Sequence, residues 1–267
     1  MSYLKPRADG ADLRIMSSNI LFDKSLENRL SLIADYYLSS DADIIGMQEV
    51  NHIGGGIFEL ISDVYTKVSE RHADEKRCFT PIVYRHDRFD LVESGSALYD
   101  KRGTDTKSMA WVVLSDKKSG KKVALINLHG SLILASYNLD ATDEVEGERW
   151  RVDNVRQILE KKDELRAKYG DLLPVFSTGD FNAYPHEKSI INMKKAMPES
   201  ADVATVSADR NVTTFHPVGR LGREGEIMDF IFVTDDSIEV LVHTVDTAKN
   251  ALDIADHSPI IADVVLK

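Results

Sequence analysis

Short apolar runs of strand length recur along the chain, and most of them end in polar side chains. Turn residues such as Ser119 and Gly120 separate some neighbouring runs, which predicts antiparallel hairpins in the middle of the chain. The expected strands are Leu13–Ile20, Ile44–Met47, Phe79–Tyr84, Phe89–Ser96, Ser108–Leu114, Lys122–Leu128, Pro174–Phe176, Ile227–Val233, Ile238–Thr244 and Ile260–Leu266. Binding and catalytic sites are often assembled from the loops that follow such strands.

Segments with helical periodicity lie between these runs. Leu26, Leu30, Ile33 and Tyr37 are spaced by four, three and four residues, and Ser25 stands where a helix cap is expected. Further helices are expected at Ile57–Val64, Trp150–Tyr169 and Glu187–Ala196, with an acidic loop at Tyr137–Glu148 before the long one. Because no linker, repeat or low-complexity segment interrupts the 267 residues, a single domain spanning 1–267 is predicted.

The charge balance limits the class of partner. The formal net charge is −11 and the isoelectric point is about 5.2, so the chain has no bulk attraction for polyanions or for anionic membranes. A nucleic-acid substrate stays possible but is not favoured, and no stable membrane association is expected. Cys78 is the only cysteine, and the sequence contains neither a signal peptide nor a membrane span. We therefore expect a cytoplasmic protein.

The segment Ser177–Pro185 is the richest in polar residues that could do chemistry. Gly179 ends an apolar strand, and Asp180 and Asn182 follow with Phe181 between them. In an extended segment residues two apart project to the same side, which would place a carboxylate beside a neutral donor. The alternative is an ordinary turn, because Asp and Asn often bond to their own backbone.

Similar polar residues stand at or just past the ends of other expected strands. Each alone could be a turn former, a surface charge or a satisfied histidine, but their shared placement favours one site. Asp229 is the hardest to dismiss, since a carboxylate in an apolar strand needs a partner, and His257 is the natural one. The residues of this group are Asn19, Glu49, His129, Asp180, Asn182, Asp229, Asp256 and His257.

Several other site classes are excluded by their missing motifs. The sequence has no Walker-type phosphate loop, no Gly-x-Ser-x-Gly elbow and no paired histidine spacing for zinc. Gly54–Gly56 is interpreted as a flexible turn. His186 and His216 flank promising segments but are assigned, like the remaining histidines, to the surface or the core.

Six short motifs in order resemble the endonuclease/exonuclease/phosphatase superfamily, which has the DNase I-like fold. They are Met-Ser-Ser-Asn, Gln-Glu-Val, Asn-Leu-His, Gly-Asp-Phe-Asn, Met-Asp-Phe-Ile-Phe-Val and Asp-His-Ser-Pro, and they extend over nearly the whole chain. The resemblance implies an α+β fold, a four-layer sandwich of two packed, mostly antiparallel mixed sheets flanked by helices. It also implies metal-dependent cleavage of a phosphoester.

The resemblance also implies a role for each residue of the group. Glu49 would hold Mg²⁺, with Mn²⁺ as a possible substitute, assisted by Asn19 and Asp256. Asp180 would orient or deprotonate the attacking water, and Asn182 would bind a phosphate oxygen. His257, held by Asp229, would contact the phosphate, and His129 would be a candidate acid for the leaving oxygen.

Two departures from the family pattern affect the expected substrate. The family often has Asn-Thr-His-Leu where this chain has Asn-Leu-His-Gly at 127–130, which weakens the assignment of His129. The acidic segment 137–148 would repel a long polyanion. A small or short phosphodiester or phosphomonoester is therefore favoured.

Three alternatives stay open: a DNA or RNA nuclease of the same superfamily, a lipid phosphodiesterase and a non-catalytic binding module. The sequence shows no exposed apolar hairpin that would reach into a bilayer; a segment such as Ser131–Leu139 is a candidate insertion, and the alternative is that it packs in the core.

Overall fold

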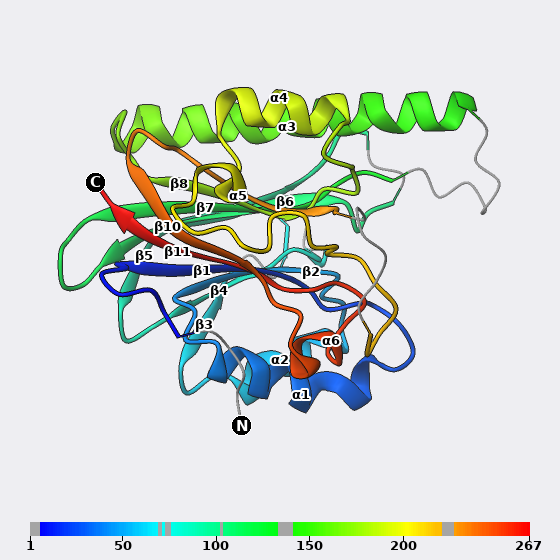
Figure 1. The fold of residues 1–267 in the computed structure, drawn as a ribbon, viewed down its shortest axis with the longest axis horizontal. Helices are drawn as coiled ribbons and strands as arrows, with labels where there is room; N and C mark the ends of the chain where they lie inside the picture. Colours follow the sequence, from blue (N-terminus) through cyan, green and yellow to red (C-terminus); the bar gives the residue numbers. More distant parts are fainter. Residues whose placement is uncertain (1–5, 69–70, 73–75, 102–103, 133–140, 221–226) are drawn as a thin grey trace.

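The computed structural model describes residues 6–68, 71–72, 76–101, 104–132, 141–220 and 227–267. In these residues two β-sheets pack face to face, and helices cover the outer face of each sheet, which makes four layers (Figure 1). The predicted four-layer α+β sandwich is confirmed. None of the described helices is both long and apolar enough to cross a membrane.

One sheet has six strands in the described part of the chain, in the order β10-β11-β1-β2-β4-β3. β1 and β2 are parallel and the other neighbours are antiparallel. The bounds, in the order of the sheet, are Ile238–Val245, Ile260–Leu266, Leu13–Asn19, Ile44–Gln48, Ile82–Arg85 and Tyr65–Val68.

The other sheet has five described strands in the order β5-β6-β7-β8-β9. The first three form the predicted antiparallel hairpins, β8 runs parallel to β7, and β9 returns antiparallel to β8. Their bounds are Phe89–Leu98, Ser108–Asp116, Lys122–His129, Val175–Asp180 and Asp229–Val233.

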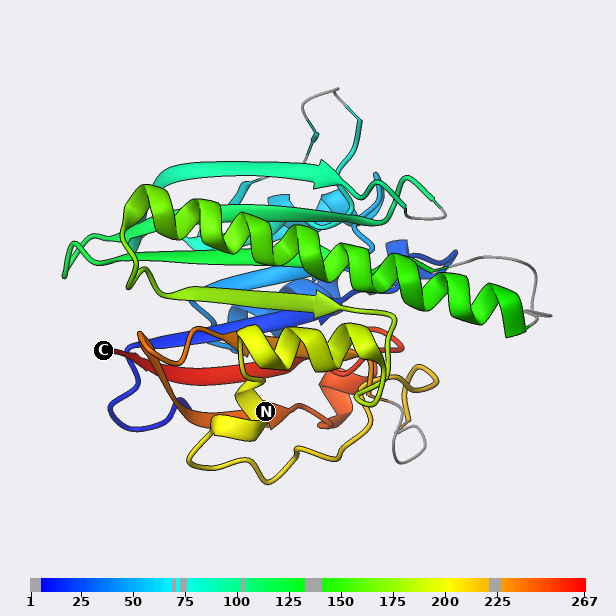
Figure 2. The same ribbon diagram turned by 90° about the horizontal axis from the view of Figure 1, so that it is seen from above.

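Helices α1, α2 and α6 cover the six-stranded sheet, whereas α3 and α4 cover the five-stranded one. Figure 2 shows the long α3 lying across the five-stranded sheet with α4 nearby. The helix bounds are Leu26–Ser39 for α1, Ile57–Leu60 for α2, Ala141–Tyr169 for α3, Lys188–Ala196 for α4, Ser200–Val203 for α5 and Lys249–Leu252 for α6.

Several element boundaries differ from the sequence prediction. Helix α3 begins at Ala141, not at Trp150, so the predicted acidic loop is helical from 141 onward. The sequence of this segment is rich in acidic residues, which are favourable near the N-terminus of a helix because its dipole is positive at that end. Gly54–Gly56 forms one turn of 3₁₀ helix, where a flexible turn was expected. Residues 133–140, which include most of the segment Ser131–Leu139, lie outside the described residues.

The buried strands send side chains alternately to two cores. In β1, Leu13 and Ile15 face the other sheet, whereas Met16 packs against the helices on the outer side. A strand covered on both faces must be apolar on both, which explains why β1 is buried throughout. The last three residues of β1, Ser17, Ser18 and Asn19, are buried although they are polar. They therefore indicate that a functional site lies at this end of the strands.

Asn127 joins the two sheets just below that end. Its amide nitrogen donates to the carbonyl oxygens of Met47 at 2.6 Å and Thr80 at 3.1 Å in the facing sheet. Its amide oxygen accepts hydrogen bonds from Gln48 Nε2 at 2.7 Å and from Thr178 Oγ1 at 3.1 Å. These buried bonds fix the position of β2 in one sheet relative to β7 and β8 in the other.

Gly46 allows this close approach, and we expect Gly46→Ala to lower the free energy of unfolding by about 1–3 kcal/mol through overpacking. A Cβ at this position would lie 2.3 Å from Thr178 Oγ1 and 2.5 Å from Asn127 Oδ1. Urea unfolding followed by circular dichroism measures the change. An unchanged midpoint would show that the sheets separate more easily than the packing indicates.

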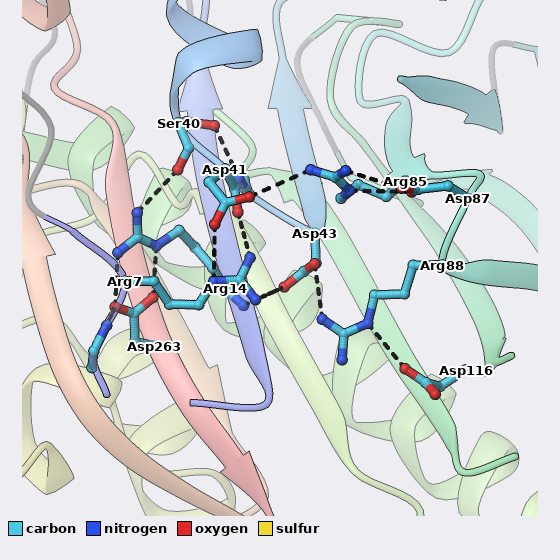
Figure 3. Close-up of polar contacts among 12 residues, drawn as sticks. Arg7, Arg14, Ser40, Asp41, Asp43, Arg85, Asp87, Arg88, Asp116 and Asp263 are labelled. Carbon is cyan, nitrogen blue, oxygen red and sulfur yellow. Dashed lines mark hydrogen bonds and ion pairs between the residues drawn. The ribbon is translucent and has the colours of Figure 1, made fainter. Parts of the chain in front are cut away.

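A network of arginine and aspartate side chains lies at the opposite end of the strands, near the starts of β1 and β2 and the end of β4 (Figure 3). The buried Asp43 pairs with Arg7 at 3.0 Å and with Arg88 at 2.9 Å. Arg88 also pairs with Asp116 of the five-stranded sheet at 2.9 Å, so this chain of charges connects the two sheets. The sandwich is thus tied by polar contacts at both ends.

Candidate functional site

The predicted site residues meet because the strands that carry them end at the same edge of the sandwich. The register pairs His129 with Asp180 across β7 and β8, and Asp180 with Asp229 across β8 and β9. Asn19 ends β1 in the facing sheet, and Glu49 directly follows β2. Parallel neighbours have their carboxyl ends together, which explains the convergence.

Asn19 connects the two sheets within the site. Its amide nitrogen donates to Glu49 Oε1 at 3.2 Å and to Asp180 Oδ2 at 3.1 Å, and its amide oxygen accepts from Leu21 N at 3.0 Å. Phe22 N donates to the second Glu49 oxygen at 2.7 Å. In this orientation Asn19 presents a donor toward the site. It therefore holds the two carboxylates in place, and its role beside a metal ion stays a prediction.

Two site residues have backbones in the left-handed region. Glu49 has φ = 63° and Asn182 has φ = 49°, a conformation that non-glycine residues adopt at some energetic cost and mostly at functional positions. The spacing of Asp180 and Asn182 predicts an extended segment, and this prediction is wrong at Asn182 because its backbone is left-handed. Its N–H donates to Asp180 Oδ1 at 2.8 Å, so the turn and the site coexist in the same residues.

Gly130 explains one departure from the family pattern. Asn182 Nδ2 donates to the carbonyl oxygen of Gly130 at 2.9 Å, and a Cβ at position 130 would lie 2.2 Å from the carbonyl oxygen of Phe181. A leucine at this position would push the two segments apart. The glycine thus permits the close packing that orients Asn182.

His257 and Asp229 form a buried pair. The His257 Nδ1 atom lies 2.7 Å from Asp229 Oδ2, and its Nε2 atom faces Asp180 Oδ2 at 3.9 Å. Burial opposes a charge on the ring, but the carboxylates of Asp229 and Asp180 outweigh burial and raise the pKa of His257 to about 10. The ring is thus held as a cation that faces the centre of the site.

Lys107 is a site residue that the sequence reasoning missed. Its Nζ lies 2.5 Å from His129 Nε2, and that ring atom also lies 3.3 Å from Asp180 Oδ2 and 3.9 Å from Glu49 Oε1. Burial lowers the pKa of Lys107, and burial together with the Lys107 charge lowers that of His129. No carboxylate of the described residues lies within ion-pair distance of Lys107. The sequence did contain a signal for Lys107. It directly precedes β6, and in an antiparallel hairpin the start of β6 lies beside the end of β7, where His129 stands.

A cleft of about 1300 Å³ opens above these residues. Glu49, His129, Asp180, Asp256 and His257 lie on its floor. Its walls come from the loops after β1 and β8, from the segment before β4 and from α3. His186, which had been assigned to the surface or the core, is exposed on one wall, whereas His216 is buried below it.

The donor set fits a hard divalent cation. Glu49, His129 and Asp180 each place one ligand atom within 4.8 Å of the others, and Asp256 Oδ1 is buried with no hydrogen-bond partner. Burial, with a contribution from Glu49, raises the pKa of Asp256 to about 6 against the effect of His257. A carboxylate oxygen without a hydrogen-bond partner, as at Asp256, is the kind of ligand that Mg²⁺ and similar ions prefer.

Comparisons with known structures show the same architecture at low sequence identity. An endonuclease/exonuclease/phosphatase from Bacteroides vulgatus is 22% identical, with a TM-score of 0.80 over 96% of this chain and 99% of that chain. A mannosyl-6-phosphatase from Bacteroides thetaiotaomicron is 22% identical, with a TM-score of 0.73 over 95% and 100%. TDP2 of D. rerio, complexed with a single-strand DNA product, is 14% identical, with a TM-score of 0.70 over 95% and 98%.

No curated protein sequence matches the chain. The sequence profile of the Endonuclease/Exonuclease/phosphatase family matches residues 16–257, from within β1, which ends at Asn19, to His257. The profile thus spans every strand that contributes to the cleft floor. The chain belongs to the endonuclease/exonuclease/phosphatase family, whose members are metal-dependent phosphoric ester hydrolases.

Proposed function

We propose that the protein is a Mg²⁺-dependent phosphoesterase that hydrolyses a phosphodiester or phosphomonoester of a small or short substrate. The observation that carries the proposal is the convergence of Glu49, Asp180 and His257 on one point at the floor of the cleft. Anionic and cationic groups around one point suit a reaction in which water attacks phosphorus and charge develops on oxygen.

In this proposal the carboxylates of Glu49 and Asp256 hold the cation. Such a cation, when bound, polarises the phosphoryl oxygen and offsets the charge that develops on it. Asp180 orients or deprotonates the attacking water, and Asn19 keeps Asp180 aligned with Glu49. Asn182 uses one amide hydrogen for Gly130, which leaves the second for a phosphate oxygen.

The cationic side of the site would face the phosphate and the leaving oxygen. His257, oriented by Asp229, contacts a phosphate oxygen and stabilises its charge. His129 remains the proposed group at the leaving oxygen. Lys107 lies beside His129 Nε2 and adds a buried positive charge that has no carboxylate within ion-pair distance among the described residues. We therefore propose Lys107 as a further phosphate-contacting residue.

The charge of the chain supports a small or short substrate, and the similar mannosyl-6-phosphatase acts on a phosphorylated sugar by its name. The likeness to TDP2 with bound single-strand DNA product keeps a nuclease as the second candidate. The lipid phosphodiesterase alternative depends on the segment Ser131–Leu139, most of which lies outside the described residues. A binding module without catalysis is disfavoured by the competent residues on the cleft floor.

The proposal is tested by hydrolysis of a phosphomonoester, a phosphodiester and a labelled oligonucleotide, each with Mg²⁺ and with EDTA. Turnover that requires Mg²⁺ supports the enzyme, and the preferred substrate separates phosphatase from nuclease. Faster cleavage of the oligonucleotide than of either small ester would favour the nuclease. Absence of turnover on all three would contradict the proposal.

We expect Lys107→Met to lower kcat/KM for the best of these substrates by about 10²-fold, because one charged donor to the phosphate is lost. The free energy of unfolding should change little, because loss of the contact with His129 is offset by removal of a buried ammonium group. The exposed Lys117→Met serves as the control. A loss of activity that follows a loss of stability would instead indicate a structural role for Lys107.

A further inference from the structure

The cleft contains exposed aromatic side chains that the hydrolytic chemistry does not use. Phe22 and Tyr184 are 49% and 37% exposed, respectively, although each is a large ring. Phe22 lies next to Phe79, with ring centroids 6.5 Å apart, and Tyr184 stacks on His186 at 5.8 Å with an angle of 3° between the planes. All four rings line the cleft. Exposed aromatic surface in a cleft is a common means of ligand recognition.

The two aromatic pairs come from segments that flank strands of different sheets: Phe22 and Phe79 flank β1 and β4 of the six-stranded sheet, whereas Tyr184 and His186 follow β8 of the five-stranded sheet. A series of hydrogen bonds runs from Phe22 N to Glu49, from Asn19 to both Glu49 and Asp180, and from Asn182 N to Asp180. Phe22 is at one end of this series. Tyr184 follows Asn182 by two residues at the other end. A phosphate bound at the centre therefore has one aromatic pair on the side of each sheet.

The described residues that line the cleft offer no surplus of positive charge beyond its floor. Apart from Lys107 and the histidines, Arg151 is the basic residue among the described residues that line the cleft. Its guanidinium donates two hydrogen bonds to Glu187 Oε2, at 2.6 and 3.1 Å. Glu148 adds a further negative charge on the same wall. A second phosphate of the substrate would meet Glu148 and Glu187 on this wall, which disfavours its binding there.

These observations together define a substrate class. On the basis of the proposed hydrolysis, we infer that the preferred substrate is a single phosphodiester that carries a planar ring group on each of its two ester oxygens. Each ring stacks on one aromatic pair. Water adds to phosphorus, the bond from phosphorus to one ester oxygen breaks, and that oxygen leaves as an alcohol with a proton. The product is the phosphomonoester of the other alcohol.

The test uses two diesters with the same leaving group, bis(4-nitrophenyl) phosphate and methyl 4-nitrophenyl phosphate, with Mg²⁺. Each kcat/KM is divided by the rate constant of the uncatalysed hydrolysis of the same diester. The resulting ratio should be about tenfold larger for bis(4-nitrophenyl) phosphate, because stacking of one ring on an aromatic side chain can account for a tenfold effect. Phe22→Ala or Tyr184→Ala should remove the preference. Phe22→Tyr and Tyr184→Phe, which keep the ring, should retain it.

The aromatic side chains can be removed without disturbing the hydrogen bonds at the site, because Phe22 and Tyr184 bond to Glu49 and Glu187 through backbone groups. Leu32→Ala, which truncates another half-exposed apolar side chain on α1, is the control. Equal efficiency on the two diesters would overturn the inference while the proposed hydrolysis stands. No Mg²⁺-dependent turnover of either would overturn both.

A further comparison tests whether the preferred substrate carries a single phosphate group. A dinucleoside monophosphate should be hydrolysed at least as efficiently as the same compound with an added 5′-phosphate. If the added phosphate improves kcat/KM, the cleft binds further phosphates and the inferred substrate class is wrong.

Discussion

We expect Asp180→Asn to lower kcat for phosphoester hydrolysis by about 10³-fold or more, since a group that orients or deprotonates the attacking water is lost. Asp180 is almost fully buried, and it accepts hydrogen bonds from Asn19 and from the N–H of Asn182. His257, His129 and Lys107 face it and, against the effect of burial, hold its pKa below the usual value. It is therefore an anion at the point where the two sheets meet.

The asparagine keeps the shape of the side chain and removes only the charge. Steady-state kinetics measure the loss, and urea unfolding checks that the variant is folded. Asp163→Asn, which alters an exposed carboxylate on α3, is the matched control and should leave kcat unchanged. Activity within tenfold of the wild type in the Asp180 variant would show that the water is handled elsewhere.

The second large effect concerns stability, where we expect Asp263→Ala to lower the free energy of unfolding by about 3–5 kcal/mol. Asp263 accepts two hydrogen bonds from Arg14, at 2.7 and 2.8 Å, and both side chains are buried (Figure 3). It also accepts a bond from Ala8 N at 2.7 Å. Removal of the carboxylate leaves a buried guanidinium without its main partner.

The matched control is Asp87→Ala, which breaks an exposed ion pair with Arg85 in the same network. Exposed pairs contribute less than about 1 kcal/mol, so this variant should unfold at nearly the wild-type denaturant concentration. A loss below about 1 kcal/mol for Asp263→Ala would mean that water reaches Arg14 and replaces the carboxylate. Because this network lies far from the cleft end of the strands, both variants should keep their activity once folded.

Much of the site could be predicted from the sequence because it follows from strand ends. Asn19, His129 and Asp180 end apolar strands, and Asp229 begins one, so their shared edge follows from the order of strands. The pairing of Asp229 with His257 also follows, since a buried carboxylate needs a partner. The single domain and the cytoplasmic location stay predictions.

Other features depend on contacts between distant segments and could not be predicted. Whether Asn19 presents its oxygen or its nitrogen to the site depends on Leu21 N and on the facing strand β8. The place of Lys107 depends on the hairpin register, and polar residues at a strand start are common on surfaces. The early start of α3 was missed because its first turns are too polar to show an apolar periodicity.

The measurement that tests the central claim most directly is the dependence of hydrolysis on Mg²⁺ concentration in the wild type, in Glu49→Gln and in Glu59→Gln, an exposed control on α2. We predict no turnover in EDTA and activation by Mg²⁺. The half-saturating concentration should rise about tenfold or more in the Glu49 variant, because loss of even an outer partner of a metal site costs that much. It should be unchanged in the Glu59 variant. Turnover that persists in EDTA, or equal Mg²⁺ dependence in all three proteins, would contradict a metal-dependent site built on Glu49.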